Sequence, residues 1–255
     1  MPRLMATDED MVIDLAGAGN FSFSAVRIEN LGATEYTLVT LVIDITGSVV
    51  HFADELLEMV KNIVDACKKH PRAENLLLRI VTFNTVIDEL HGFKELHNID
   101  ISSYKAFHPD GMTRLFDATY ESVSATLEYS KRLMDQDFDV NGAVYIVTDG
   151  LDNRSTMGPG QIKEKINTAL QNEDIIESMI TVLVGLNDPN SEPTWKQQVA
   201  DELKEFKDEA GITQFVDVGD ATPGKLAKLA GFVSQSVSSQ SQALGTGAPS
   251  QPITF

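Results

Sequence analysis

Strongly apolar runs alternate with amphipathic stretches along most of the chain, and this alternation predicts strands that alternate with helices. The runs are short and continuously hydrophobic, as in the buried strands of a parallel sheet. They cover residues 36–43, 76–83, 143–149, 179–184 and 214–218. Between them, apolar side chains recur at the three- and four-residue spacing of a helix face. The predicted helices are centred on residues 52–67, 116–127, 162–170, 195–206 and 226–237.

This order of elements predicts the fold class. Strands that alternate with helices pair in parallel through right-handed crossovers, which place helices on both faces of the sheet. We therefore expect an α/β fold: a doubly wound, mostly parallel central sheet flanked by helices, with residues 86–90 as one short antiparallel edge strand. The predicted domain covers residues 36–237. Residues 1–35 form an N-terminal extension with a candidate for an added strand at 21–25, and residues 238–255 form a polar tail rich in Ser, Gln and Gly.

Composition narrows the choice of partners. The chain has 255 residues, a formal net charge of −18 and a sequence pI near 4.5. This charge argues against nucleic acid or an anionic membrane as the main partner, because both attract clustered Lys and Arg. Cys67 is the only cysteine, which excludes an intramolecular disulfide and a thiolate zinc site. The N-terminus has no apolar signal-peptide core and no window is long enough to span a membrane, so we expect a soluble, cytoplasmic protein.

Oxygen-bearing side chains stand at the ends of two predicted strands. Asp44, Thr46 and Ser48 follow the first strand at alternate positions, and Asp149 ends the strand of residues 143–149. An unpaired polar group in such a buried place costs roughly 1–3 kcal/mol. In a doubly wound sheet these two strands are neighbours where the strand order reverses, so the two carboxylates meet at one crevice. Two such acids repel each other unless a cation lies between them.

A further hydroxyl completes a candidate site for a hard cation. Thr113 follows Gly111 at the start of a predicted helix. Two carboxylates, three hydroxyls and some waters suit Mg²⁺, which prefers oxygen ligands and keeps several waters. Helix capping is the alternative, because Asp, Ser and Thr are favoured caps, and each segment alone fits a cap or an ordinary turn as well or better. Together, in this order and at strand ends, the side chains favour a metal site.

Three segments resemble the metal-ion-dependent adhesion site of von Willebrand factor A domains: Asp44-x-Thr46-x-Ser48, Asp-Gly-Met-Thr-Arg-Leu at 110–115, and Val-Thr-Asp-Gly at 147–150. The resemblance covers roughly residues 36–235 and implies a Rossmann-like fold. The metal ligands that it implies are Asp44, Thr46, Ser48, Thr113 and Asp149. It also implies that Mg²⁺ or Mn²⁺ is bound directly by the hydroxyls, and that a carboxylate of a partner protein completes the coordination. Thr46 departs from the more usual Ser but keeps the hydroxyl oxygen.

The residues and the resemblance together predict a binding module that captures an acidic residue of a partner, not an enzyme. The last predicted helix, around residues 232–238, is similar to the ends of stand-alone bacterial or phage A-domain proteins, including those of tellurium-resistance (TerY-like) clusters. This similarity implies an adaptor in a multiprotein system of the stress-response or defence type. Two alternatives stay open: a structural component of a phage or multiprotein assembly, and a metal-dependent phosphohydrolase with Asp44 as nucleophile. The phosphohydrolase would lack its usual general acid, because Thr46 occupies that position. The sequence leaves the oligomeric state open.

Overall fold

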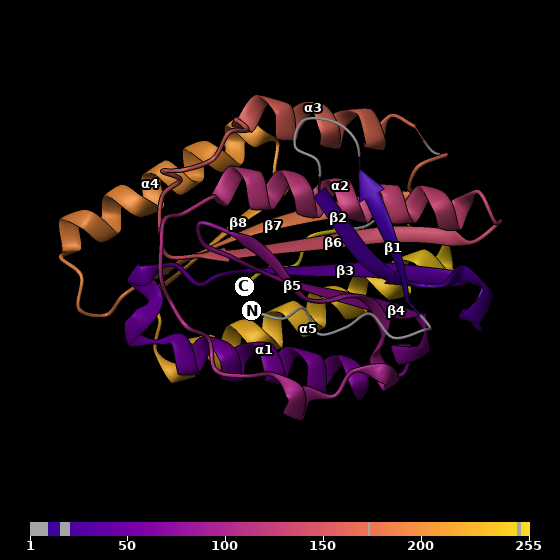
Figure 1. Cartoon of the computed structure of the whole chain (residues 1–255), viewed down its shortest axis with the longest axis horizontal. Helices are drawn as coiled ribbons and strands as arrows, with labels where there is room; N and C mark the ends of the chain where they lie inside the picture. The colour runs from indigo at the N-terminus through magenta and orange to yellow at the C-terminus, as the bar shows by residue number, and fades with distance from the viewer. Residues whose placement is uncertain (1–9, 16–20, 173, 249–250) are drawn as a thin grey trace.

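The computed structural model describes residues 10–15, 21–172, 174–248 and 251–255, and contains one eight-stranded sheet with helices on both faces (Figure 1). The strands are β1 (Asp10–Leu15), β2 (Phe21–Val26), β3 (Glu35–Asp44), β4 (Leu76–Phe83), β5 (Ile87–Glu95), β6 (Asp139–Thr148), β7 (Ser178–Asn187) and β8 (Gln214–Asp220). The helices are α1 (Ala53–Lys68), α2 (Leu115–Met134), α3 (Pro159–Leu170), α4 (Pro193–Ala210) and α5 (Pro223–Thr246). The predicted α/β class and its mostly parallel sheet are confirmed.

Double winding begins at β3, in the middle of the sheet, whose order is β1-β2-β5-β4-β3-β6-β7-β8. β3 pairs in parallel with β4 on one side and with β6 on the other, so the strand order reverses at β3. Helices α1 and α5 cover one face of the sheet, and α2, α3 and α4 cover the other (Figure 1). The strand that ends in Asp44 is therefore the neighbour of the strand that leads into Asp149, as predicted.

The antiparallel part of the sheet is larger than the sequence predicts. β5 extends well beyond residues 86–90, and it is not an edge strand, because the β1–β2 hairpin pairs beyond it. The strand candidate at 21–25 is confirmed as β2, whereas the hydrophobic pattern does not predict β1. Aromatic packing joins the hairpin to the rest of the protein. Phe23 meets Phe93 edge to face with ring centroids 6.3 Å apart, and Phe93 stacks on Tyr129 of α2 at 5.2 Å.

Gly92 permits the close approach of β5 to β2. A Cβ built at this position would lie 1.8 Å from the carbonyl oxygen of Ser24, far inside contact distance. We expect Gly92→Ala to displace the hairpin and to lower the free energy of unfolding by about 1–3 kcal/mol, the usual range for overpacking. Urea unfolding measures the loss. The control is Gly231→Ala in α5, where a Cβ meets nothing within 4 Å; equal stability of the two variants would contradict the prediction.

His91 on β5 is a buried histidine that the fold holds neutral. Its Nδ1 donates to the carbonyl oxygen of Gly92 at 2.8 Å, so its Nε2 accepts from the hydroxyl of Tyr104, also at 2.8 Å. Burial lowers the pKa of His91 from 6.5 to about 4. Between these two pH values the unfolded chain binds a proton that the folded protein does not, so the free energy of unfolding falls as the pH drops, by about 3 kcal/mol in all.

We expect His91→Phe to remove this part of the acid sensitivity. The measurement is the free energy of unfolding in urea, for both proteins, near neutral pH and again near the lowered pKa. The wild type should lose more stability than the variant between the two conditions. Equal losses in the two proteins would show that His91 contributes nothing to the acid sensitivity.

The last helix, α5, is longer than the sequence predicts. It runs to Thr246, and so includes the first part of the polar tail expected from residue 238 onward. Gln240 and Ser241 are buried there, and the Nδ2 of Asn141 donates to the carbonyl oxygen of Gln240 at 2.8 Å. Polar residues thus face the protein where apolar ones are expected. No helix in the described part of the chain is long and apolar enough to cross a membrane, and the cytoplasmic location stays a prediction.

Candidate metal centre

Asp44 is the last residue of β3, and both of its carboxylate oxygens accept hydrogen bonds. Oδ1 accepts from the backbone N–H of Thr46 at 2.8 Å, and Oδ2 accepts from the hydroxyl of Thr148 at 2.6 Å. Only 1% of the residue is exposed. Burial raises the pKa of this carboxyl, and the hydrogen bonds from Thr148 and Thr46 oppose the rise. Asp44 is therefore a fixed and desolvated acid at the carboxyl edge of the sheet.

Asp149 follows the neighbouring strand and is joined by hydroxyl groups to the turn after β3. The hydroxyl of Ser48 donates to Oδ1 of Asp149 at 2.7 Å. The hydroxyl oxygens of Thr46 and Ser48 are 3.0 Å apart, within hydrogen-bond distance of each other. The pKa of Asp149 is raised, first by burial and then by the negative charge of Asp44. The second acid is thus held close to the first.

Thr113 reaches the same place from the loop before α2. Its backbone N–H donates to Oδ1 of Asn153 at 2.9 Å, and its carbonyl oxygen accepts from the backbone N–H groups of Asn153 and Arg154, each at 3.1 Å. These bonds tie the loop to the segment after β6. A Cβ built at Gly150 would lie 3.8 Å from the Thr113 hydroxyl oxygen and 3.9 Å from that of Ser48. The glycine therefore leaves free the space beside both hydroxyls.

Helix capping accounts for little of this arrangement. Thr46 precedes the short 3₁₀ helix Gly47–His51, but its side chain makes no capping hydrogen bond. Helix α2 begins after Arg114, so Thr113 lies outside it, and the first backbone N–H groups of the helix donate to the side chains of Asp152 and Ser155 instead. The hydroxyls of Thr46 and Ser48 bond to each other and to a carboxylate instead. The capping interpretation therefore leaves these oxygens unexplained.

The donor set fits a hard divalent cation. No Lys or Arg is paired with Asp44 or Asp149 in the described part of the chain, whereas the nearby Asp117 pairs with Arg114 at 2.7 Å. A bound cation would relieve the repulsion between the two acids. Among the described residues, no group of three or more His, Cys, Asp or Glu side chains is placed to hold a metal ion, so a site here depends on hydroxyl oxygens. Oxygen ligands alone suit Mg²⁺ or Mn²⁺ rather than zinc.

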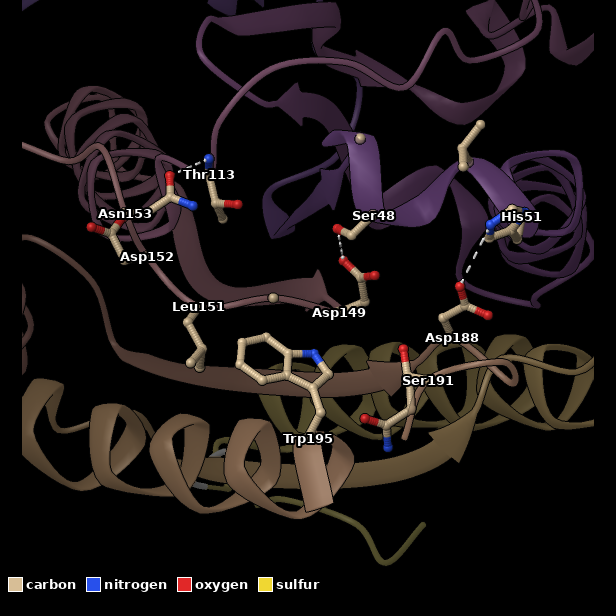
Figure 2. A pocket seen from close by; sticks show the side chains of 14 residues that line it. Ser48, His51, Thr113, Asp149, Leu151, Asp152, Asn153, Asp188, Ser191 and Trp195 are labelled. Atoms are coloured by element: carbon tan, nitrogen blue, oxygen red, sulfur yellow. Dashed lines mark hydrogen bonds and ion pairs between the residues drawn. The ribbon is translucent and has the colours of Figure 1, made fainter. Parts of the chain in front are cut away.

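A pocket of about 520 Å³ opens onto these oxygens (Figure 2). Ser48, Thr113 and Asp149 line the pocket, whereas Asp44 and Thr46 are buried next to it and are not part of its wall. The structure therefore brings all the predicted site residues to one edge of the sheet and gives three of them access to a ligand. Their role as metal ligands stays a prediction.

Three residues have a place or role at the site that the sequence pattern does not predict. The sequence pattern gives Thr148 no role, yet its hydroxyl donates to Oδ2 of Asp44 and fixes that oxygen. The sequence does contain a signal for this role, because Thr148 stands directly before the strand-end acid Asp149. The helical spacing of apolar residues over 195–206 predicts that Trp195 lies on the buried face of its helix, but Trp195 is 47% exposed and lines the pocket. Asp188 follows β7 at the same edge and also lines the pocket. The position of Asp188 shortly after the predicted strand of residues 179–184 is the sequence signal that could have identified it.

Comparison with known proteins supports the fold. No family model and no curated protein matches the chain. Among solved structures, the PilB minor pilin from Streptococcus sanguinis superposes with a TM-score of 0.53 and 14% sequence identity, over 90% of this chain and 67% of that one. The open conformation of the pilus adhesin SpaC from Lactobacillus rhamnosus GG superposes with a TM-score of 0.55 and 10% identity, over 91% of this chain and 34% of that one.

Because the sequence identities are low, these superpositions show a similar fold and nothing about function. This chain spans about a third of the length of the pilus adhesin that it resembles. The doubly wound sheet and these structural neighbours define a protein with a Rossmann-like α/β fold.

Proposed function

We propose that this protein is a cation-dependent binding module that captures an acidic side chain of a partner protein. The observation that carries the proposal is the pair of buried acids, Asp44 and Asp149, which lies beside pocket-lining hydroxyls and has no basic partner among the described residues. The doubly wound α/β fold is the one that a von Willebrand factor A domain would have, and the three motifs resemble the adhesion site of that family. The residues that would hold Mg²⁺ or Mn²⁺ are Asp44, Thr46, Ser48, Thr113 and Asp149.

Each residue has a distinct part in this proposal. When bound, the cation supplies an electrophilic position that an outside carboxylate can occupy. Ser48 and Thr113 are neutral, so only the two aspartates offset the charge of the ion. Asp44 is already oriented by the Thr148 hydroxyl and a backbone N–H, and Asp149 by the Ser48 hydroxyl. We expect modest affinity for a partner, because one carboxylate contact must also offset the entropy of association.

The surroundings of Asp44 favour binding over catalysis. A phosphohydrolase nucleophile needs a carboxylate oxygen that is free to attack, but both oxygens of Asp44 are engaged in hydrogen bonds and the residue is almost fully buried. Thr46 also stands where such enzymes carry a general acid. We therefore expect no turnover of generic phosphoesters. The cytoplasmic location and the role as an adaptor in a bacterial or phage multiprotein system belong to the same proposal.

Cation binding and partner capture test this function directly. Calorimetric titration of the purified chain with Mg²⁺ or Mn²⁺ should show saturable binding of a single ion. A cation concentration of about 100 times the dissociation constant should raise the free energy of unfolding by about 2.7 kcal/mol. Pull-down from the native lysate should retain a partner in Mg²⁺ and lose it in EDTA. Capture that persists unchanged in EDTA would contradict the proposal.

A further inference from the structure

The pocket continues beyond the proposed cation site to a second wall. This wall contains Trp195 from the start of α4, Asp188 after β7 and Leu151 after β6. Figure 2 shows the indole of Trp195 rising from α4, with Leu151 on one side and Ser191 on the other, towards Asp149. A ligand that fills the pocket would therefore meet this wall as well as the cation. We call the pair of Trp195 and Asp188 the second subsite.

Trp195 leaves a large aromatic face open to the pocket. It is the only tryptophan of the chain, and 47% of it is exposed. The apolar residues that follow it on α4 are buried in the core: Val199, Leu203 and Phe206. Packing of the helix therefore does not require an indole at position 195. An open indole is the aromatic surface that attracts cationic groups most strongly.

Asp188 adds a negative charge to the same wall. Its Oδ1 accepts from the backbone N–H of Asn190 at 2.8 Å, which fixes the carboxylate in the turn after β7. The nearest side chain that could form an ion pair with its Oδ2 is His51, whose Nε2 lies 3.9 Å away and whose side chain is 60% exposed. In the described part of the chain, Asp188 has no ion pair with Lys or Arg. The Asp188 side chain is 15% exposed and lines the pocket, so a ligand in the pocket can contact its carboxylate.

Charge complementarity determines which partner fits both walls. A divalent cation balances the charges of Asp44 and Asp149, so Asp188 is uncompensated when a partner adds a further carboxylate. The net charge of −18 also opposes the approach of a purely acidic segment. A basic side chain beside the acidic one removes both difficulties, because it can contact the indole and the free carboxylate together.

We propose, building on the function proposed above, that the partner segment carries an arginine or lysine close to its metal-binding acid. This basic side chain stacks on Trp195 and pairs with Asp188. Arginine fits better than lysine, because its planar guanidinium can stack on an indole while it donates to a carboxylate. The second subsite therefore selects among the acidic segments that the cation alone would accept.

A displayed library of random peptides tests the proposed function and this inference together. The full chain is immobilised in Mg²⁺, and bound phage are released with EDTA, so that only cation-dependent binders are sequenced. We expect an acidic residue in the selected peptides and an arginine or lysine within a few positions of it. Selected peptides without tryptophan are then titrated against the chain, with the fluorescence of Trp195 as the readout.

Substitutions in the second subsite leave the cation ligands in place. Trp195→Leu removes the aromatic face, and Asp188→Asn removes the charge. We expect each to weaken binding of the selected peptides about three- to tenfold by calorimetry, with unchanged affinity for Mg²⁺. Trp195→Phe should recover part of the loss, because it restores an aromatic face. Asp201→Asn, which changes an acid on α4 outside the pocket, should bind like the wild type.

The outcomes distinguish the inference from the function on which it rests. The inference would be overturned if the selected acidic peptides had no basic residue near the acid. It would also be overturned if they had an aliphatic residue there and their binding depended on Trp195. Both results would leave the proposed function intact. An unchanged preference for basic residues in Trp195→Leu and Asp188→Asn would also overturn it. If EDTA releases no acidic peptides, the proposed function itself is wrong, and the inference is wrong with it.

Discussion

Replacement of Asp44 by asparagine is expected to weaken Mg²⁺ binding about 100-fold while the fold stays in place. Asparagine has nearly the same shape; its Oδ1 can still accept from the Thr46 N–H, and its Nδ2 can donate to the Thr148 hydroxyl. The change removes one of the only two negative charges among the proposed ligands. A 100-fold loss corresponds to about 2.7 kcal/mol of binding free energy. Calorimetric titration measures it, and urea unfolding in EDTA checks the fold.

Asp220→Asn is the matched control for this prediction. Asp220 also ends a strand at the carboxyl edge of the sheet, but it pairs with Lys196 at 2.7 Å and lies outside the pocket wall. Its replacement should leave Mg²⁺ affinity and partner capture unchanged, whereas Asp44→Asn should lower both together. If Asp44→Asn bound Mg²⁺ as tightly as the wild type, the ion would have to bind elsewhere on this acidic protein, and the proposed site would be wrong.

The central strands could be predicted from the sequence because helices cover both of their faces. Nearly every residue of β3, β4, β6 and β7 is buried, so their apolar runs are visible without knowledge of the neighbouring strands. β1 gives no such signal, since it carries two acids, its Val12 is 58% exposed, and its place depends on pairing with β2. The end of α5 could not be predicted from the sequence for a related reason. Gln240 and Ser241 are buried there with hydrogen bonds from Asn141 and Arg72, so no apolar pattern marks this part of the helix.

The meeting of Asp44 and Asp149 could be predicted because topology alone places the two strand ends side by side. Ser48 and Thr46 lie on the turn that follows directly, so their positions are almost as strongly determined. The second subsite could not be predicted in this way. It depends on how the start of α4 lies relative to the end of β7, and helical periodicity places Trp195 with the buried face of its helix. Local patterns therefore predict the cation site better than the wall that faces it.

Replacement of Asp149 by asparagine is expected to stabilise the metal-free protein and, at the same time, to abolish its stabilisation by Mg²⁺. The Oδ1 of asparagine can still accept from the Ser48 hydroxyl, so that hydrogen bond is retained. The negative charge, which burial and Asp44 both disfavour, is removed. The pKa is raised from 3.8 to about 7, and each unit corresponds to about 1.4 kcal/mol, so we expect a gain of up to about 4 kcal/mol in EDTA at mildly alkaline pH. In saturating Mg²⁺, the wild type alone should gain stability.

The sign of this effect separates a cation site from a structural network. Asp117 is the matched control: burial raises its pKa, but the Met157 N–H and the Arg114 guanidinium outweigh burial and lower it. Asp117→Asn should therefore lose about 1–3 kcal/mol of stability, in EDTA and in Mg²⁺ alike. If Asp149→Asn behaved in the same way, its carboxylate would be a structural acceptor for Ser48, and no ion would be needed. Opposite signs would mean that the charge of Asp149 destabilises the metal-free protein and serves a bound ligand.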